Sequence, residues 1–206
     1  MAYSSDLQPA ALCLNRFSAR EKAPGTMKPS ASIPVAVLMY SLLGPAAHAQ
    51  TTAAPLETIR NFQVVSDQLA SAGQIGYDQI PLIREEGYEV VINLAIADEE
   101  RNGKEGFLVA QEGLTYVHIP VDWNQPRLSD LEMFFDVMQA NDDRKVFVHC
   151  FANMRASAFV YLYRTLVEGD AEATALATMN EVWDPGELQQ WADLIQRAQA
   201  EYAGGQ

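Results

Sequence analysis

Short β-branched segments alternate with amphipathic helical segments through most of this chain. The runs Glu89–Leu94 and Lys145–His149 are short, rich in valine, and bounded by turn residues, as buried strands are. Strands separated by helices predict a mostly parallel central sheet flanked by helices on both faces. The predicted fold class is therefore α/β, with ligands bound beyond the carboxyl ends of the strands.

The other predicted elements follow the same alternation. Strands are predicted at 62–64, 89–94, 115–120 and 145–149, and helices at 77–86, 105–112, after Ser129, and at 155–168, 171–183 and 185–202. Ser129 is expected to cap its helix, with Glu132 three residues later completing a capping box. The strand at 115–120 is expected to lie beside the strand that ends at His149.

Residues 1–49 differ in sequence pattern from the rest of the chain. They are expected to be a leader, with a signal peptide at about 27–49. Lys28 supplies its positive charge, residues 33–43 supply an apolar run, and Ala47-His48-Ala49 is a cleavage pattern. The apolar run is shorter than the ~20 residues that span a bilayer. We therefore expect a periplasmic or secreted protein without a stable membrane anchor.

Residues 50–206 are expected to form one domain, and charge and cysteine content limit what it can do. The chain has 14 Lys and Arg against 27 Asp and Glu, a formal net charge of −13. Such a surface repels nucleic-acid phosphates and anionic lipid headgroups, which disfavours both as partners. Cys13 lies in the expected leader, so Cys150 has no partner for an intramolecular disulfide. The sequence does not indicate an oligomeric state.

The segment from Cys150 to Arg155 is the candidate catalytic segment. Cys150 ends a predicted strand and Arg155 opens a predicted helix, so the intervening N–H groups would surround a tetrahedral anion. The same donors favour the thiolate form of the cysteine, and the planar guanidinium of the arginine would hold two anion oxygens. Asp122, just after another strand, would protonate a leaving group. The substrate-binding candidates are Phe151, Ala152, Asn153, Met154 and Ser157.

Val148-His149-Cys150 together with Arg155-Ala156-Ser157 resembles the signature of the cysteine-dependent, dual-specificity-type protein tyrosine phosphatases. The resemblance extends over about 62–200, and Val121–Pro126 is similar to the family's general-acid loop. It implies Cys150 as nucleophile, Arg155 as phosphate clamp and Asp122 as general acid. The implied reaction hydrolyses a phosphomonoester, of phosphotyrosine or of a small phosphorylated molecule, through a phosphocysteine intermediate. It needs no metal and no cofactor.

Three differences from the family pattern keep alternatives open. Four residues separate Cys150 from Arg155, where the phosphatases have five, and the loop has no glycine. Asn153 is the loop residue that best tolerates the left-handed region. Ala156 stands where a hydroxyl residue is expected, with Ser157 one place later. Four-residue loops also resemble rhodanese-type sulfurtransferases, so a Cys150 persulfide enzyme and an inactive phosphate-binding module are the alternatives.

Histidines and tryptophans in the expected domain have simpler interpretations. His118 and His149 do not have the spacing of metal ligands. We expect His149 to orient the cysteine backbone from within the core, and Trp183 and Trp191 to be core residues. Trp123, beside the predicted general acid, is placed to stack on a substrate.

The expected signal peptide can be tested directly. Exported protein should begin near Gln50, because cleavage follows the small residues Ala47 and Ala49. N-terminal sequencing of protein recovered outside the cytoplasm measures this. An exported chain that retains Met1 or Met27 would contradict the prediction.

Overall fold

The computed structural model describes residues 54–203, so the expected leader and its cleavage site lie outside the described residues. The strands form one five-stranded sheet in the order β1-β2-β5-β3-β4. The strands are β1 (Gln63–Ser66), β2 (Leu69–Ala72), β3 (Val90–Asn93), β4 (Thr115–His118) and β5 (Val146–His149). All neighbours are parallel except β1, which is antiparallel to β2. The predicted α/β class is confirmed.

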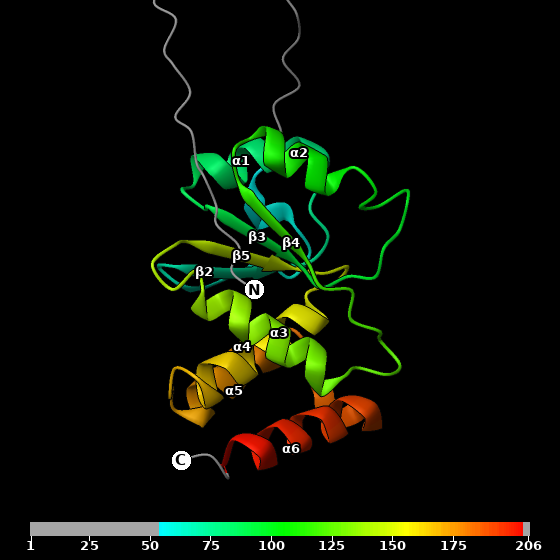
Figure 1. Ribbon diagram of the computed structural model, residues 1–206, viewed down its shortest axis with the longest axis vertical. Coiled ribbons are helices and arrows are strands. Elements are labelled where there is room, and N and C mark those ends of the chain that lie inside the picture. The colour runs from blue at the N-terminus through cyan, green and yellow to red at the C-terminus, as the bar shows by residue number, and fades with distance from the viewer. Residues whose placement is uncertain (1–53, 204–206) are drawn as a thin grey trace, which may run out of the picture. The chain divides into compact units, whose positions relative to one another are not determined.

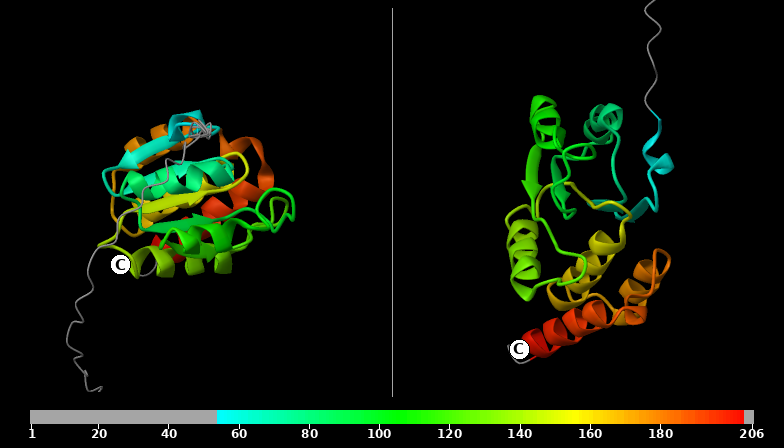
Figure 2. Two further views of the ribbon diagram at one scale, coloured as in Figure 1. Left: turned by 90° about the horizontal axis from the view of Figure 1, so that it is seen from above. Right: turned by 90° about the vertical axis from the view of Figure 1, so that its right-hand side faces the viewer.

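Helices cover both faces of this sheet (Figures 1 and 2). One face carries α1 and α2, and the other carries α3 to α6. The α-helices are α1 (Ile80–Glu85), α2 (Glu105–Gln111), α3 (Leu128–Gln139), α4 (Met154–Leu166), α5 (Glu172–Asn180) and α6 (Gln189–Ala203). Three short 3-10 helices lie at Leu56–Thr58, Tyr77–Gln79 and Pro185–Glu187. Within residues 54–203, no helix has the length and apolar character needed to cross a bilayer.

The central strand β5 divides its side chains between two cores. Val148 packs in the larger core, with Phe159 of α4 and Trp191 of α6, and all three are fully buried. Phe147 packs in the smaller core beneath α1 and α2. Successive side chains of a strand point to opposite faces. His149 therefore faces α2, while Cys150 belongs to the core beneath α4.

Strand β2 was not predicted from the sequence. Its residues, Leu69 to Ala72, are mostly small and have weak strand propensity. Pairing with β1 on one side and β5 on the other imposes the strand, and every residue in it is buried.

Two further predictions are wrong. The strand before Asp122, β4, does not lie beside β5, because β3 pairs with both of them. Helix α3 begins at Leu128 rather than after a Ser129 cap, and its N-cap position, Arg127, makes no capping bond. Arg127 instead binds Asp130 through Nε (3.1 Å) and Nη2 (2.7 Å), and this pair ties the first turn together.

Candidate active site

The loop after β5 turns sharply into α4. Cys150 follows the strand, and its side chain is fully buried. Asn153, at the N-cap of α4, has a φ of 64°, in the left-handed region that favours glycine. Asparagine is among the few other residues that adopt it readily. The sequence expectation for Asn153 is confirmed, and the turn forms without a glycine.

Backbone donors gather at this turn. The Phe151 carbonyl accepts a hydrogen bond from Gln74 N (3.3 Å), so the next N–H, that of Ala152, points away from Gln74. The first in-helix bond of α4 runs from Ser157 N to Asn153 O (2.8 Å). The N–H groups of the preceding turn have no carbonyl in the helix to bind, which leaves them available for an anion.

A second layer of residues braces the loop. The Asn153 Nδ2 donates to Asn61 O (2.6 Å) and Ser71 Oγ (3.1 Å), and Asn61 Nδ2 donates to Ala152 O (2.9 Å). Gly73 lies so close to the backbone of Arg60 that a Cβ on residue 73 would be 2.7 Å from the Arg60 carbonyl oxygen. Sequence reasoning did not assign these bracing residues to the site, because their contacts to the loop are long-range.

Arg155 joins the loop to the segment that carries the predicted general acid. Only 7% of the residue is exposed, and its Nε donates to Val121 O (2.9 Å). Its guanidinium carbon lies 5.2 Å from the centroid of the Trp123 ring. No described residue accepts a hydrogen bond from its Nη atoms. These are the donors that a clamp for two anion oxygens requires.

Asp122 is exposed and lies in the loop between β4 and α3. Its Oδ1 accepts from Asn124 N (2.7 Å) and Gln125 N (3.0 Å), so one carboxylate oxygen organises the loop. The other oxygen, Oδ2, has no hydrogen-bond partner among the described residues. A carboxyl group held by one oxygen and free at the other can carry a proton to a leaving group.

Three tryptophans tie the Asp122 loop to α4. The Trp123 ring centroid lies 5.3 Å from that of Trp183 and 5.2 Å from that of Trp191. Trp191 Nε1 donates to Trp123 O (3.0 Å), and Trp183 Nε1 donates to Met154 O (2.9 Å). Both Trp183 and Trp191 were predicted to be core residues. Trp191 is fully buried, which confirms the prediction for it, whereas Trp183 is half-buried and packs against the core. The cluster positions the acid loop over the start of α4.

His149 anchors a buried polar network on the α2 side of the sheet. Its Nε2 lies 2.8 Å from Glu105 Oε1, and both side chains are fully buried. Glu105 also accepts from Asn93 Nδ2 (3.0 Å) and Gln74 Nε2 (2.9 Å). Burial alone would raise the pKa of Glu105, but the hydrogen bond and charge of His149, with smaller contributions from Gln74 and Tyr116, hold that pKa below its ordinary value. The predicted buried, structural position of His149 is confirmed, whereas its partner Glu105 was missed.

Comparison with known proteins places the chain in a family. Residues 56–194 match the family model described as DSP-PTPase phosphatase fused to NAD+ kinase. A DUF442 phosphatase structure from Shewanella putrefaciens CN-32 is 38% identical, covers 71% of this chain and 94% of its own, and has a TM-score of 0.64. The chain belongs to this phosphatase family. The predicted membership of the cysteine-dependent dual-specificity-type superfamily is thereby confirmed.

More distant structures share the fold of this phosphatase. The active form of Tk-PTP is 14% identical, with a TM-score of 0.58 over 68% of this chain and 97% of its own. TpbA from P. aeruginosa is 18% identical, with a TM-score of 0.55 over 69% and 87%. A variant of TpbA is known in complex with pTyr. No curated protein sequence matches the chain.

Ser157, a predicted substrate-binding residue, lies inside the helix, and His118, which was not predicted to belong to the site, lies away from Cys150. Ser157 is buried in the first turn of α4, and its Oγ donates to Met154 O (3.2 Å). His118 Nε2 lies 2.7 Å from Ala95 O on the opposite side of β3 from Cys150's strand. Among residues 54–203, no three His, Cys, Asp or Glu side chains are grouped as a metal site would need.

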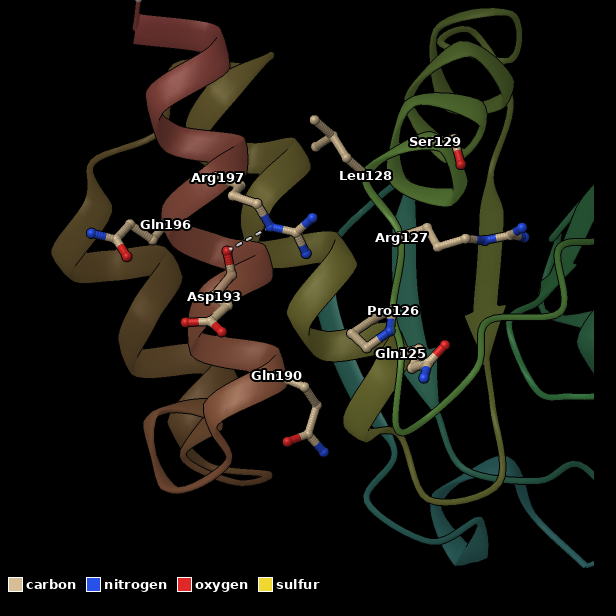
Figure 3. A pocket seen from close by; sticks show the side chains of 9 residues that line it. All are labelled: Gln125, Pro126, Arg127, Leu128, Ser129, Gln190, Asp193, Gln196 and Arg197. Atoms are coloured by element: carbon tan, nitrogen blue, oxygen red, sulfur yellow. Dashed lines mark hydrogen bonds between the residues drawn. The ribbon is translucent and has the colours of Figure 1, made fainter.

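A cavity of about 530 Å³ lies beside the acid loop, between Gln125–Ser129 and α6 (Figure 3). In Figure 3, Arg197 reaches from α6 toward this loop, whereas Arg127 extends away from α6. Arg127 is paired with Asp130, with 2.7 Å between Nη2 and Oδ1. Cys150 does not line the cavity. The candidate active site is therefore defined by the chemistry around the β5–α4 turn and not by this hollow.

The buried carboxylate of Glu105 allows a test of the polar network around His149. Because the folded state lowers the pKa of Glu105, its charge stabilises the fold above the unfolded value of about 4.3. That stabilisation is lost as the pH falls through the folded value. Glu105→Gln should lower the free energy of unfolding by about 2 kcal/mol at pH 7, the worth of hydrogen bonds to a buried charged group. The difference from wild type should shrink as the pH falls below the unfolded value of about 4.3 and toward the lower folded value, as the wild-type carboxylate is protonated.

Urea denaturation at several pH values measures this effect. Glu85→Gln, at an exposed position of α1, is the matched control and should change stability little. The Oε1 of Gln74 has no partner within residues 54–203, so its amide can turn to accept from the new side chain without a change in volume. A Glu105→Gln deficit that is the same at pH 3 and pH 7 would show that the charge contributes nothing.

Proposed function

We propose that this phosphatase hydrolyses phosphomonoesters through a phosphocysteine intermediate on Cys150. The observation that carries the proposal is the meeting of three groups at one turn. Cys150 directly follows β5, the N–H groups that begin α4 lie beside it, and Arg155 donates through Nε to Val121 O while its Nη atoms have no acceptor among the described residues. The substrate would be a phosphoprotein or a phosphorylated small molecule. The pTyr complex of a TpbA variant supports phosphotyrosine as one candidate.

In the proposed first step, the Cys150 thiolate attacks phosphorus and the ester P–O bond breaks. Asp122 gives its proton to the departing oxygen, so an alcohol or phenol leaves. The Nη atoms of Arg155 and the N–H groups of α4 bind the phosphoryl oxygens as charge develops on them. No metal or cofactor takes part.

In the proposed second step, water attacks the phosphocysteine. The Asp122 carboxylate takes one proton from the water, the S–P bond breaks, and phosphate leaves with the thiolate restored. The hydroxyl of Ser157 donates to Met154 O within the helix. Because this hydroxyl is engaged within the helix, the N–H groups at the start of α4 have to stabilise the departing thiolate instead.

Trapping of the intermediate tests the proposal. Wild-type protein mixed with para-nitrophenyl phosphate and quenched in acid should carry one phosphoryl group on Cys150 in peptide mass spectrometry, and Cys150→Ser should carry none at that position. The four-residue loop is the one feature that favours sulfur transfer. A persulfide formed from thiosulfate, without a phosphoryl adduct, would replace the proposal with that function. If neither adduct forms, the remaining alternative is an inactive phosphate-binding module.

The role of Asp122 gives a sharper prediction. Asp122→Asn should lower kcat by ~10²–10⁴-fold for an alkyl phosphate, the usual effect of losing a positioned proton donor. The loss should be much smaller for para-nitrophenyl phosphate, whose leaving group is already a stable anion. KM should change little, because the proton is transferred in the transition state. Steady-state kinetics on the two substrates measures the difference.

The chain supplies a matched control for this substitution. Asp184 also accepts a backbone N–H two residues on, from Gly186 (2.8 Å), in an exposed turn. Asp184→Asn should leave both rates unchanged. In either variant the amide oxygen can keep the backbone hydrogen bonds, so loop geometry is preserved. Equal losses on both substrates in Asp122→Asn would rule out the general-acid role.

An exported location is also part of the proposal. It is supported by the charge, apolar run and cleavage pattern of residues 27–49. A periplasmic or secreted enzyme would meet phosphorylated molecules outside the cytoplasm.

A further inference from the structure

Arg101 lies over the first residue of the Cys150 loop. Its guanidinium carbon is 3.9 Å from the centroid of the Phe151 ring, and Phe151 directly follows Cys150. The guanidinium carbon of Arg155 is 6.0 Å from the same centroid. One aromatic ring therefore has two guanidinium groups near it. Arg155 is the buried one, whereas 55% of the Arg101 side chain is exposed.

A hydrogen-bonded turn fixes Arg101 before any ligand arrives. Asp98 Oδ1 accepts from Glu100 N (3.1 Å) and Arg101 N (2.9 Å). Asp98 Oδ2 accepts from Arg101 Nε (2.9 Å) and lies 2.9 Å from its Nη2. Asn102, which is buried, closes the turn by donating to Ile96 O (3.0 Å) and accepting from Asp98 N (2.8 Å). Such preorganisation reduces the entropy lost when a ligand binds.

The guanidinium keeps donors for a ligand. Asp98 occupies only one edge of the group, through Nε and Nη2. The Nη1 atom has no hydrogen-bond acceptor among the described residues. Stacking on Phe151 fixes the plane in which these donors lie. A planar guanidinium with free N–H groups suits a carboxylate or a phosphate group.

The charge of the molecule limits how Arg101 can act. With 27 acidic and 14 basic residues, the surface as a whole repels anions. Glu99 and Glu100 lie within the turn and are exposed, so no broad positive field surrounds Arg101. Exposed charges are also screened over about 8 Å at physiological ionic strength. An anionic group can therefore gain from Arg101 only by direct contact.

We propose that Arg101 is a specificity-determining residue that binds a second anionic group of the substrate, close to the phosphoryl group at Cys150. The inference rests on the proposed function. The preferred substrates are phosphomonoesters with a carboxylate or a second phosphate near the ester oxygen. Because Arg101 does not touch the reacting atoms, it acts on the choice of substrate and not on the chemical step.

A matched series of substrates tests the proposal. Phenyl phosphate, 3-carboxyphenyl phosphate and 1,3-phenylene bisphosphate share a leaving-group framework and differ in the second anion. Wild type should prefer the two esters that carry a second anionic group. Arg101→Gln should reduce that preference about tenfold, mainly through KM, as loss of a charge-assisted hydrogen bond would. Activity on phenyl phosphate should change much less, because this ester has no second anionic group for Arg101 to bind. The two anionic substrates show whether carboxylate or phosphate is favoured.

Two further variants separate contact from charge alone. Arg101→Lys keeps the positive charge but loses the planar fork, so it should retain an intermediate preference. Arg84→Gln removes an exposed arginine from α1, whose guanidinium donates to the Glu112 carbonyl, and should leave the preference unchanged. The same preference in wild type and Arg101→Gln would overturn the proposal, as would a wild type that has none.

Binding to Cys150→Ser keeps the question separate from catalysis. Titration calorimetry should show tighter binding of 3-carboxyphenyl phosphate than of phenyl phosphate, and Arg101→Gln in this background should abolish the difference. If wild type turns over none of these esters and forms no phosphocysteine, the proposed function fails. The binding difference then still decides the role of Arg101.

Discussion

The left-handed turn at Asn153 is the constraint on which the site depends. It reverses the chain between β5 and α4 so that the helix begins directly beside Cys150. An asparagine at this position loses some stability relative to glycine. Its side chain offsets that loss with bonds to Asn61 O and Ser71 Oγ, which a glycine could not make. The turn is thus stabilised by a strand and a segment that lie far from it in sequence.

A second constraint joins parts of the chain that the sheet keeps apart. β3 lies between β5 and β4, so the acid loop has to cross the end of an intervening strand to reach Cys150. Val121 N donates to Leu94 O (3.3 Å) just beyond β3, and Val121 O accepts from Arg155. One residue of the acid loop is therefore bonded both to the end of the central sheet and to the proposed phosphate clamp. The tryptophan cluster adds apolar packing to this connection.

The sequence was sufficient to predict the elements that have a strong pattern of their own. The valine-rich strands, the helix periodicity, the Cys150–Arg155 spacing and the asparagine in the turn are local features, and local features can be read from one chain. Strand β2 has small residues and becomes a strand only through its two neighbours. The order of the strands is likewise set by pairing. Glu105 left one signal, an acidic residue at a core-facing position of α2, but its partner lies 44 residues away.

The alternation of β5 explains why polar and reactive groups coexist here. His149 points to the α2 side, where Glu105 joins it to Asn93 at the end of β3. Cys150, one residue later, belongs to the apolar core beneath α4. The buried network thus fixes the carboxyl ends of two neighbouring strands from one face, while the reactive loop leaves from the other. Because a buried carboxylate in such a network is costly to leave unpaired, Glu105 holds the ends of β3 and β5 together through Asn93 and His149. Strand ends that are joined in this way keep Cys150 and the first turn of α4 in register, which a site built on backbone donors requires.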